Sequence, residues 1–332
     1  MAQAREIQNR IKSIQDTMKI TKAMYMVSSM KVQKAKNKLA ETAPYFYGLK
    51  RQIADILLHF PEIRHLYFDN RSKDLKETVK KKGFIIVTGD KGMAGAYNIN
   101  ILKKAREAIE GAEDYRLFFV GEYGRHAFSD KKEHIADDFH ATAYDPSVHR
   151  ARVMTEYLMD LYDREALDEI YIIYTRMVNT LTEEVVKEQL LPLRTSAFLR
   201  ASMKAKGDMA KDGDYLIYPS PEQVLGYLTK NYVTGYLYGA LTESFASEES
   251  ARMFAMQTAT DNGDKMLSGL SVTYNRMRQA AITQEITEVI GGAKSLRRRK
   301  KKTESAKKPE GFPGAVAGTA PEQSNPADKE SS

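Results

Sequence analysis

The chain has 332 residues, of which 42% are hydrophobic, and it contains no cysteine. This composition is sufficient for one large or two modest folded domains, and the lack of thiols excludes disulfides, thiolate nucleophiles and thiolate metal sites. The formal net charge of +7 is unevenly distributed, because basic residues cluster at both ends, and this pattern indicates an acidic partner surface that the termini contact.

The N-terminal segment, residues 1–60, is predicted to be a long coiled-coil helix. Its seam residues alternate at spacings of four and three, Lys and Arg fill the outer positions, and no Gly or Pro occurs before Pro44. The seam consists of Ile7, Ile11, Ile14, Met18, Thr21, Tyr25, Ser28, Val32, Ala35, Leu39 and Thr42. Thr21 and Ser28 are small and polar, so they allow a partner helix to approach closely with less hydrophobic contact.

The central region, residues 75–203, has a different pattern, in which short apolar runs alternate with helical segments. Strands are predicted at residues 83–88, 115–121 and 169–174, and helices near 99–109 and 148–161. The alternation favours a Rossmann-like α/β domain with a largely parallel sheet. Residues 204–219 are predicted to form a loop that returns to a second long helix.

A glycine-rich turn at Gly89–Gly95 follows the first predicted strand and precedes a helix, which is where phosphate-binding loops occur. Its glycines do not match G-x-G-x-x-G, and the Gly-Lys-Ser/Thr ending of a P-loop is missing. A nicotinamide-dinucleotide-binding enzyme domain with helical extensions, with Glu122 as the ribose acid, is therefore the alternative interpretation. A tight strand-to-helix turn is the favoured one.

No other catalytic or metal-binding pattern is evident. The six histidines include no H-x-x-x-H or H-E-x-x-H pair, so no metal site is expected. No nucleophile elbow supports a hydrolase. The acidic pairs Asp137-Asp138 and Glu183-Glu184 are interpreted as solvated turns.

The C-terminal segment, residues 220–293, is predicted to be the second coiled-coil helix. Ser220 can cap its start, Pro221 occupies the first helical position, and Gln223 completes a capping-box spacing. The predicted apolar positions are Val224, Leu228, Leu237, Leu241, Ala251, Ala255, Met266, Leu270, Met277, Ala281 and Ile286. The helix is expected to end at Gly291-Gly292.

The tail, residues 294–332, begins with a basic cluster at Arg297–Lys302 and continues as a stretch rich in Pro, Gly, Ser, Ala and Glu. This composition predicts disorder. A solubilising tail is favoured over contact with RNA or anionic lipid. The basic N-terminal helix lacks aromatic residues interleaved with its lysines, so no nucleic-acid partner is expected.

Two distant motifs resemble the gamma subunit of the rotary ATP synthase. Residues 11–27, IKSIQDTMKITKAMYMV, are similar to the family's N-terminal helix, and residues 251–256, 259–263 and 274–288 are similar to its C-terminal helix. Residues 90–98, DKGMAGAYN, resemble the family's glycine turn and explain that turn without a nucleotide. The resemblance covers residues 1 to about 293.

The resemblance implies a long antiparallel coiled coil that flanks the central α/β domain. The paired helices would fill a ring of three alpha and three beta subunits, and the globular part would sit on the epsilon subunit and the membrane c-ring, with a delta subunit in the same complex. The chain would be a non-catalytic rotor without cofactors that couples proton flow to ATP synthesis. It would lie peripherally on the cytoplasmic face of a bacterial inner membrane.

The resemblance also implies which residues contact the ring. Met24, with its neighbours Lys19 and Lys22, would face the acidic lever loop of a beta subunit. The remaining polar contacts between shaft and ring would come from Arg252, Arg278, Gln279, Thr283 and Glu285.

Overall fold

The computed structural model describes residues 2–68, 79–179, 182–204 and 216–305. The chain divides into two compact units, residues 10–269 and a smaller unit made of the residues before and after this range. The helices and strands are α1 (Ala2–His59), β1 (Lys81–Val87), α3 (Tyr97–Ile109), β2 (Asp114–Val120), α4 (Glu122–Ala127), η1 (Ser129–His134), α5 (Val148–Asp163), β3 (Glu169–Met177), β4 (Glu183–Leu191), α6 (Thr195–Lys204) and α7 (Pro221–Ser305). Most of the predicted loop at 204–219 lies outside the described residues.

The central sheet has the order β2-β1-β3-β4. β1 runs parallel to both β2 and β3, while β4 pairs antiparallel with β3. The prediction of an α/β domain with a largely parallel sheet is therefore confirmed. The interpretation of Glu183-Glu184 as a solvated turn is wrong, because these residues begin β4 and pair with Met177 and Arg176. An edge strand with few apolar residues carries a weak sequence signal.

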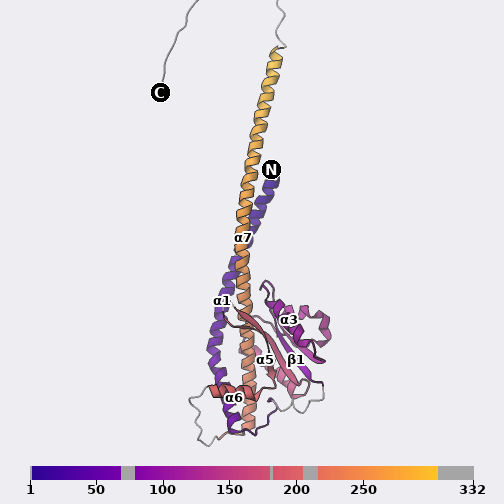
Figure 1. The fold of residues 1–332 in the computed structure, drawn as a ribbon, viewed down its shortest axis with the longest axis vertical. Coiled ribbons are helices and arrows are strands. Elements are labelled where there is room, and N and C mark those ends of the chain that lie inside the picture. The colour runs from indigo at the N-terminus through magenta and orange to yellow at the C-terminus, as the bar shows by residue number, and fades with distance from the viewer. Residues whose placement is uncertain (1, 69–78, 180–181, 205–215, 306–332) are drawn as a thin grey trace, which may run out of the picture. The chain divides into compact units, whose positions relative to one another are not determined.

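Apolar side chains cover both faces of this sheet. On one face Ile85 and Ile172 pack in a cluster with residues of α1, α5 and α7. On the other face Phe84 and Ile86 pack with Ile101 of α3. The sheet and the adjoining parts of α1 and α7 therefore share one core, and Figure 1 shows the helices around the strands.

Within residues 10–269, α1 and α7 lie side by side in opposite directions (Figure 1). Thr21 Oγ1 is 2.7 Å from Thr260 Oγ1, and Lys31 Nζ is 2.9 Å from Glu249 Oε1. Each step towards the C-terminus of α1 is thus matched by a step towards the N-terminus of α7. The prediction of an antiparallel helix pair is confirmed, and every predicted seam residue from Ile11 to Thr42 is buried or half-buried.

Small residues set how closely the two helices approach. A Cβ atom on Gly263 would lie 2.6 Å from Met18 Cγ, and one on Gly235 would lie 1.8 Å from the Phe46 ring. Met266, one of the predicted apolar positions of this helix, is 59% exposed and does not belong to the seam. A pattern of apolar residues does not register glycine and threonine. These small residues on α7 nevertheless leave the space into which α1 side chains pack.

α7 begins as predicted, with the Ser220 hydroxyl accepting a hydrogen bond from the Gln223 amide at 3.3 Å. Its other end differs from the prediction, because the helix continues through Gly291-Gly292 to Ser305. Ile286, another of the predicted apolar positions, is 54% exposed. Two glycines cost a helix only about 1 kcal/mol each, and the next helix-breaking proline is Pro309. The first part of the predicted disordered tail is therefore helical, and residues 306–332 lie outside the described part.

Candidate functional site on the helix pair

An open groove of about 710 Å³ runs along α1 beside the α/β domain. Its apolar wall includes Ile20, Met24 and Val27, one helical turn apart on α1, and Phe245 of α7. These positions on α1 are offset from the seam that faces α7, so α1 carries a second apolar face.

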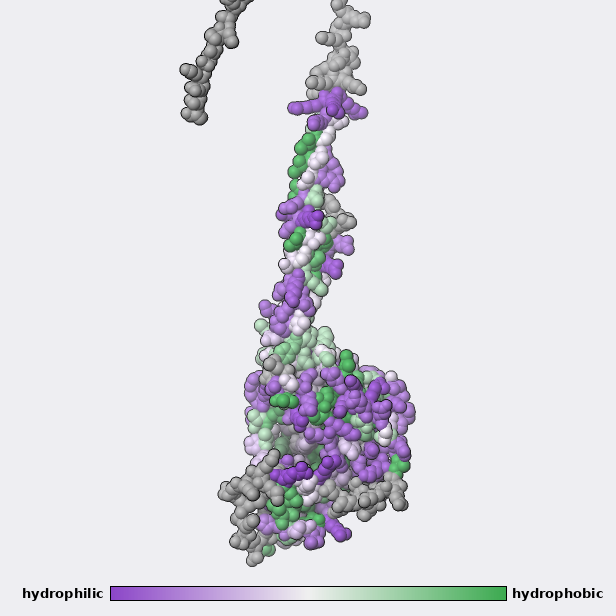
Figure 2. All heavy atoms as spheres, viewed as in Figure 1, coloured by the Kyte–Doolittle hydropathy of each residue, from purple (hydrophilic) through white to green (hydrophobic). Residues whose placement is uncertain are grey.

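This second face is open to solvent. Ile20 is 62% exposed, Val27 51% and Met30 73%. Figure 2 shows apolar side chains gathered where the helix pair leaves the hydrophilic surface of the α/β part. Contiguous exposed apolar surface of this kind typically marks a protein–protein contact.

The groove ends in an ion-pair cluster, which consists of the half-buried Lys31 and the buried Glu248, Glu249 and Arg252. Arg252 donates from Nη2 to Glu248 Oε1 at 2.5 Å, and its Nη1 lies 3.0 Å from Glu249 Oε1. Lys31 donates from α1 to the same Glu249 oxygen at 2.9 Å. Glu248, Glu249 and Arg252 are 5%, 2% and 9% exposed. The cluster joins α1 to α7 where both pass the sheet.

Burial and the ion pairs act in opposite directions on the pKa values of this cluster. Desolvation raises the pKa of Glu248 above its usual value, and the hydrogen bond from Arg252 only partly offsets it. Desolvation acts to lower the pKa of Arg252, but the hydrogen bonds and charges of Glu248 and Glu249 outweigh it, so its pKa is raised. Arg252 therefore keeps its charge and holds the two carboxylates together.

The glycine turn after β1 packs directly against the cluster. A Cβ atom on Gly89 would lie 2.6 Å from Glu248 Oε1, and the Gly89 amide donates to Asn98 Oδ1 at 2.9 Å. Asp90 accepts hydrogen bonds from the Thr142 hydroxyl and the Tyr144 amide. The carboxylates of Glu248 and Asp90 thus border the turn, and their negative charge would repel a phosphate. This arrangement supports a structural turn over a dinucleotide site.

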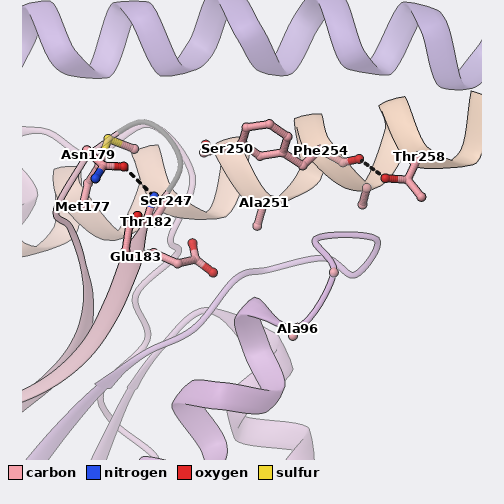
Figure 3. A pocket seen from close by; sticks show the side chains of 12 residues that line it. Ala96, Met177, Asn179, Thr182, Glu183, Ser247, Ser250, Ala251, Phe254 and Thr258 are labelled. Carbon is pink, nitrogen blue, oxygen red and sulfur yellow. Dashed lines mark hydrogen bonds between the residues drawn. The ribbon is translucent and has the colours of Figure 1, made fainter. Parts of the chain in front are cut away.

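A second cavity, of about 300 Å³, lies between the β3–β4 hairpin and α7 (Figure 3). Its polar lining includes Glu183, Asn179 and Ser247, and its apolar lining includes Phe254. We call it the hairpin cavity. No group of three or more His, Asp or Glu residues suited to a metal ion occurs in the described part of the chain.

A family model described as ATP synthase matches residues 3–296. The ATP synthase gamma chain of Ruminiclostridium cellulolyticum is 44% identical over 293 residues, which cover 88% of this chain and 98% of that relative. The chain belongs to the ATP synthase gamma-chain family. A further relative, the "ATP synthase gamma chain, sodium ion specific" of Acetobacterium woodii, is 38% identical over 88% of this chain and 98% of its own length.

Solved structures agree with this gamma-chain fold. A chain of the Euglena gracilis mitochondrial ATP synthase, in a structure of OSCP, F1 and c-ring, matches with a TM-score of 0.63 and 16% identity. The match covers 90% of this chain and 96% of that chain. The resemblance to the gamma subunit and the predicted fold are thereby confirmed, while the basic cluster at Arg297–Lys302 lies beyond the residues that the family model matches.

The gamma-chain residues predicted to contact the ring fall into separate groups. Met24 and Arg252 line the same groove. Lys19 and Lys22 are exposed on α1 outside the groove lining, and Lys19 Nζ lies 2.9 Å from Asp16 Oδ1. Arg252 is largely enclosed by its own chain, which the sequence did not indicate.

The other predicted contacts belong to the smaller unit. Arg278, Gln279, Thr283 and Glu285 are all exposed on α7. The Thr283 hydroxyl donates to the Gln279 carbonyl at 2.9 Å, so Thr283 is oriented by its own helix. Their side chains form an accessible polar surface.

Sequence reasoning missed Lys31, Glu248 and Glu249 as members of the groove. The available signal was the pair of acids at 248–249, whose neighbours within residues 244–251 are all small or apolar. A charged residue is rarely buried unless it is paired, so that signal pointed to an ion pair rather than to a solvated face.

Proposed function

We propose that this chain is the rotor of an ATP synthase, the central-stalk subunit that couples ion flow through the membrane sector to ATP synthesis. The helix pair would turn inside a ring of three alpha and three beta subunits. The α/β domain would rest on the epsilon subunit and the c-ring, with a delta subunit elsewhere in the complex. The complex would place the chain on the cytoplasmic face of a bacterial inner membrane.

The observation that carries this proposal is the second, solvent-exposed apolar face of α1. Ile20, Val27 and Met30 are not needed for pairing with α7, and they remain open. A chain that worked alone would gain nothing from this exposure. Membership of the gamma-chain family supports the ring as the partner that would cover this face.

The exposed polar residues suit a contact that must break and re-form during rotation. Lys19, Lys22, Arg278, Gln279, Thr283 and Glu285 would provide the polar contacts with the ring. Exposed ion pairs contribute about 0–1 kcal/mol each, so no single contact would stop the shaft. Arg252 would act differently, because its guanidinium is already held by Glu248 and Glu249.

The chain itself would not catalyse ATP chemistry. The groove offers apolar surface and a closed ion-pair cluster, without a nucleophile and base in hydrogen-bonding geometry. No helix in the described ranges has both the length and the apolarity to cross a membrane. The coupling ion would be the proton, and stimulation of membrane ATP hydrolysis by sodium would contradict that choice.

Reconstitution tests the proposal. The isolated chain should neither hydrolyse ATP nor bind nicotinamide nucleotides. Purified alpha and beta subunits should gain ATPase activity when the chain is added, and a fluorophore on the α/β domain should then rotate in one direction. Turnover of a substrate by the isolated chain, or no effect on alpha and beta subunits, would show that the proposal is wrong.

The second apolar face provides a sharper variant. Replacing Ile20 and Val27 with Ser should leave the isolated chain folded and lower the reconstituted ATPase activity several-fold. A matched control is Ile99→Ser, since Ile99 is 62% exposed on α3 and should tolerate the change in both assays.

A further inference from the structure

The hairpin cavity contains a carboxylate that lacks a cation. Glu183 begins β4, and Figure 3 shows its carboxyl end directed into the space between the hairpin, Ala96 and Ala251. No ion pair joins Glu183 to another described residue, whereas its neighbour Glu184 lies 3.2 Å from Arg176 Nη2. The two adjacent acids therefore differ in that only one is neutralised within the chain.

The Glu183 carboxylate is partly desolvated as well as unpaired. Although Glu183 as a residue is exposed, the protein around its carboxyl group raises its pKa through desolvation alone, with no opposing charge or hydrogen bond. A carboxylate in this situation is stabilised by any cation that enters the cavity. Binding of a positively charged group beside the Glu183 carboxylate would therefore be favourable.

A second polar group in the cavity also lacks a partner. Ser247 is fully buried, and its Oγ has no hydrogen-bond partner among the described atoms. Most buried hydroxyl groups in proteins are hydrogen-bonded. By contrast, the Thr258 hydroxyl, also in the lining, is satisfied by the Phe254 carbonyl at 2.9 Å. An unsatisfied acceptor and hydroxyl in one cavity indicate a missing hydrogen-bond donor.

The remaining lining fits an aliphatic stem. Gly95, Ala96, Ala251 and Ala255 are small and leave the space open, and Phe254 supplies an apolar wall. Lysine and arginine side chains combine such a stem with a charged, hydrogen-bonding end. A volume of about 300 Å³ is sufficient for one such side chain.

We propose that the hairpin cavity is a socket for one lysine or arginine side chain of a neighbouring subunit, with Glu183 as the counter-ion and Ser247 as a hydrogen-bond partner. This inference rests on the proposed function, because it places another subunit of the complex against the β3–β4 hairpin. Anionic occupants are excluded by Glu183, and the cavity lacks the several acidic ligands that a divalent cation requires.

The test compares two adjacent substitutions with the same change in charge. Glu183→Gln removes the counter-ion, and Glu184→Gln is the control on the same strand. Each full-length variant is titrated against purified alpha–beta ring and, separately, against purified epsilon subunit. Glu183→Gln should weaken binding to one of these partners roughly tenfold, the scale expected for one partly desolvated charge contact. Glu184→Gln should change it by less than about twofold.

A chemical measurement identifies the occupant. A carbodiimide joins a carboxylate to a contacting lysine amine, so mass spectrometry of the assembled wild-type complex should find Glu183 linked to one partner lysine. Loss of affinity without this link assigns the occupant as arginine. Ser247→Ala should lower the affinity for the same partner about threefold without changing the thermal unfolding temperature of the isolated chain.

Equal affinities of Glu183→Gln and Glu184→Gln for both partners would overturn the socket. Failure of the proposed function gives a different result, because the wild-type chain would then bind neither partner. Thermal unfolding of the isolated variants separates misfolding from loss of contact, and Glu183→Gln should fold normally because the charge that it removes is uncompensated.

Discussion

The sheet and the helix pair are stabilised in different ways. Phe84, Ile85 and Ile86 of β1 are fully buried between helices on both faces. The seam between α1 and α7 instead contains Thr21 and Ser28, and α1 exposes large apolar side chains on its other side. The sheet is therefore a complete core, while the helix pair is only partly covered by its own chain.

The difference separates two requirements. A core gains stability from each apolar group that it buries, at about 25 cal/mol per Å². A shaft that must turn inside a partner needs surface that remains available for that partner. Substitutions should therefore be most destabilising in the sheet and progressively less so in the helix pair.

The largest effect is expected for Phe118→Ala in β2. Phe118 is fully buried, and its ring packs against Phe139 and Tyr157 at centroid distances of 5.5 and 6.2 Å. The substitution should lower the free energy of unfolding by about 3–5 kcal/mol, as measured by urea denaturation. Tyr47→Ala, at a position that is 61% exposed on α1, should lower it by less than about 1 kcal/mol.

Arg252→Ala should have the next largest effect, because it leaves Glu248 and Glu249 buried with Lys31 as their remaining cation. Breaking a buried ion pair costs about 3–5 kcal/mol, and the lower end is expected because Lys31 still reaches Glu249. Urea denaturation measures the loss. Arg278→Ala, on an exposed position of α7, is the control, and a comparable loss there would remove the distinction between buried and exposed arginines.

Gly235→Ala tests the close approach of the helices. The new methyl group would overlap the Phe46 ring, which lies 1.8 Å from its position, and overpacking of this kind costs about 1–3 kcal/mol. Gly239→Ala is one turn further along α7 with no atom within 4 Å of the new methyl. It should be stabilising by about 0.5–1 kcal/mol through helix propensity. A lower thermal unfolding temperature for Gly235→Ala and a higher one for Gly239→Ala would support the close approach of the two helices at Gly235.

The smallest effect concerns acid sensitivity and compares two glutamates. Desolvation acts to raise the pKa of Glu169, but hydrogen bonds from Lys80 and Tyr171 outweigh it, so its pKa is lowered from 4.5. Its contribution to stability is present above pH 4.5 and is lost as the pH falls through its lowered pKa. Glu169→Gln should therefore flatten the decline of stability below pH 4.5.

Glu183 should behave in the opposite way. Its pKa is raised from 4.5 by desolvation, so its contribution is present below pH 4.5 and is lost as the pH rises through the raised value. Glu183→Gln should make the isolated chain relatively more stable near neutral pH. The free energy of unfolding of both variants is measured between pH 3 and 7. Curves of the same shape would contradict the opposite pKa shifts of Glu169 and Glu183.

The sequence predicted the fold well where periodicity is strong. The seam of α1 follows from its regular spacing, and the three parallel strands follow from continuous apolar runs. The sequence does not predict β4, because it is an edge strand in which five of the nine residues are charged or polar, namely Glu183, Glu184, Lys187, Glu188 and Gln189. The extension of α7 past Gly291 was missed because a local glycine signal was given more weight than the surrounding helix formers.

The candidate site was predicted only in part. The resemblance led to Met24 and Arg252, and these two residues do line one groove. The ion-pair cluster and the hairpin cavity depend on contacts between residues far apart in the chain, and spacing along a sequence carries no information about them. Contacts of the exposed residues with a ring remain predictions, because they involve other chains.

The antiparallel helix pair also has a consequence for folding, because its contacts join residues far apart in the chain. Thr21 meets Thr260 across a sequence separation of 239 residues, and Lys31 meets Glu249 across 218. Contacts this distant form late, since the entropy of closing the intervening loop must first be overcome. The sheet shares its core with Leu57 of α1 and Leu225 of α7. We therefore expect the α/β domain to complete its core only when α7 is present, and the seam between the helices to form together with that core.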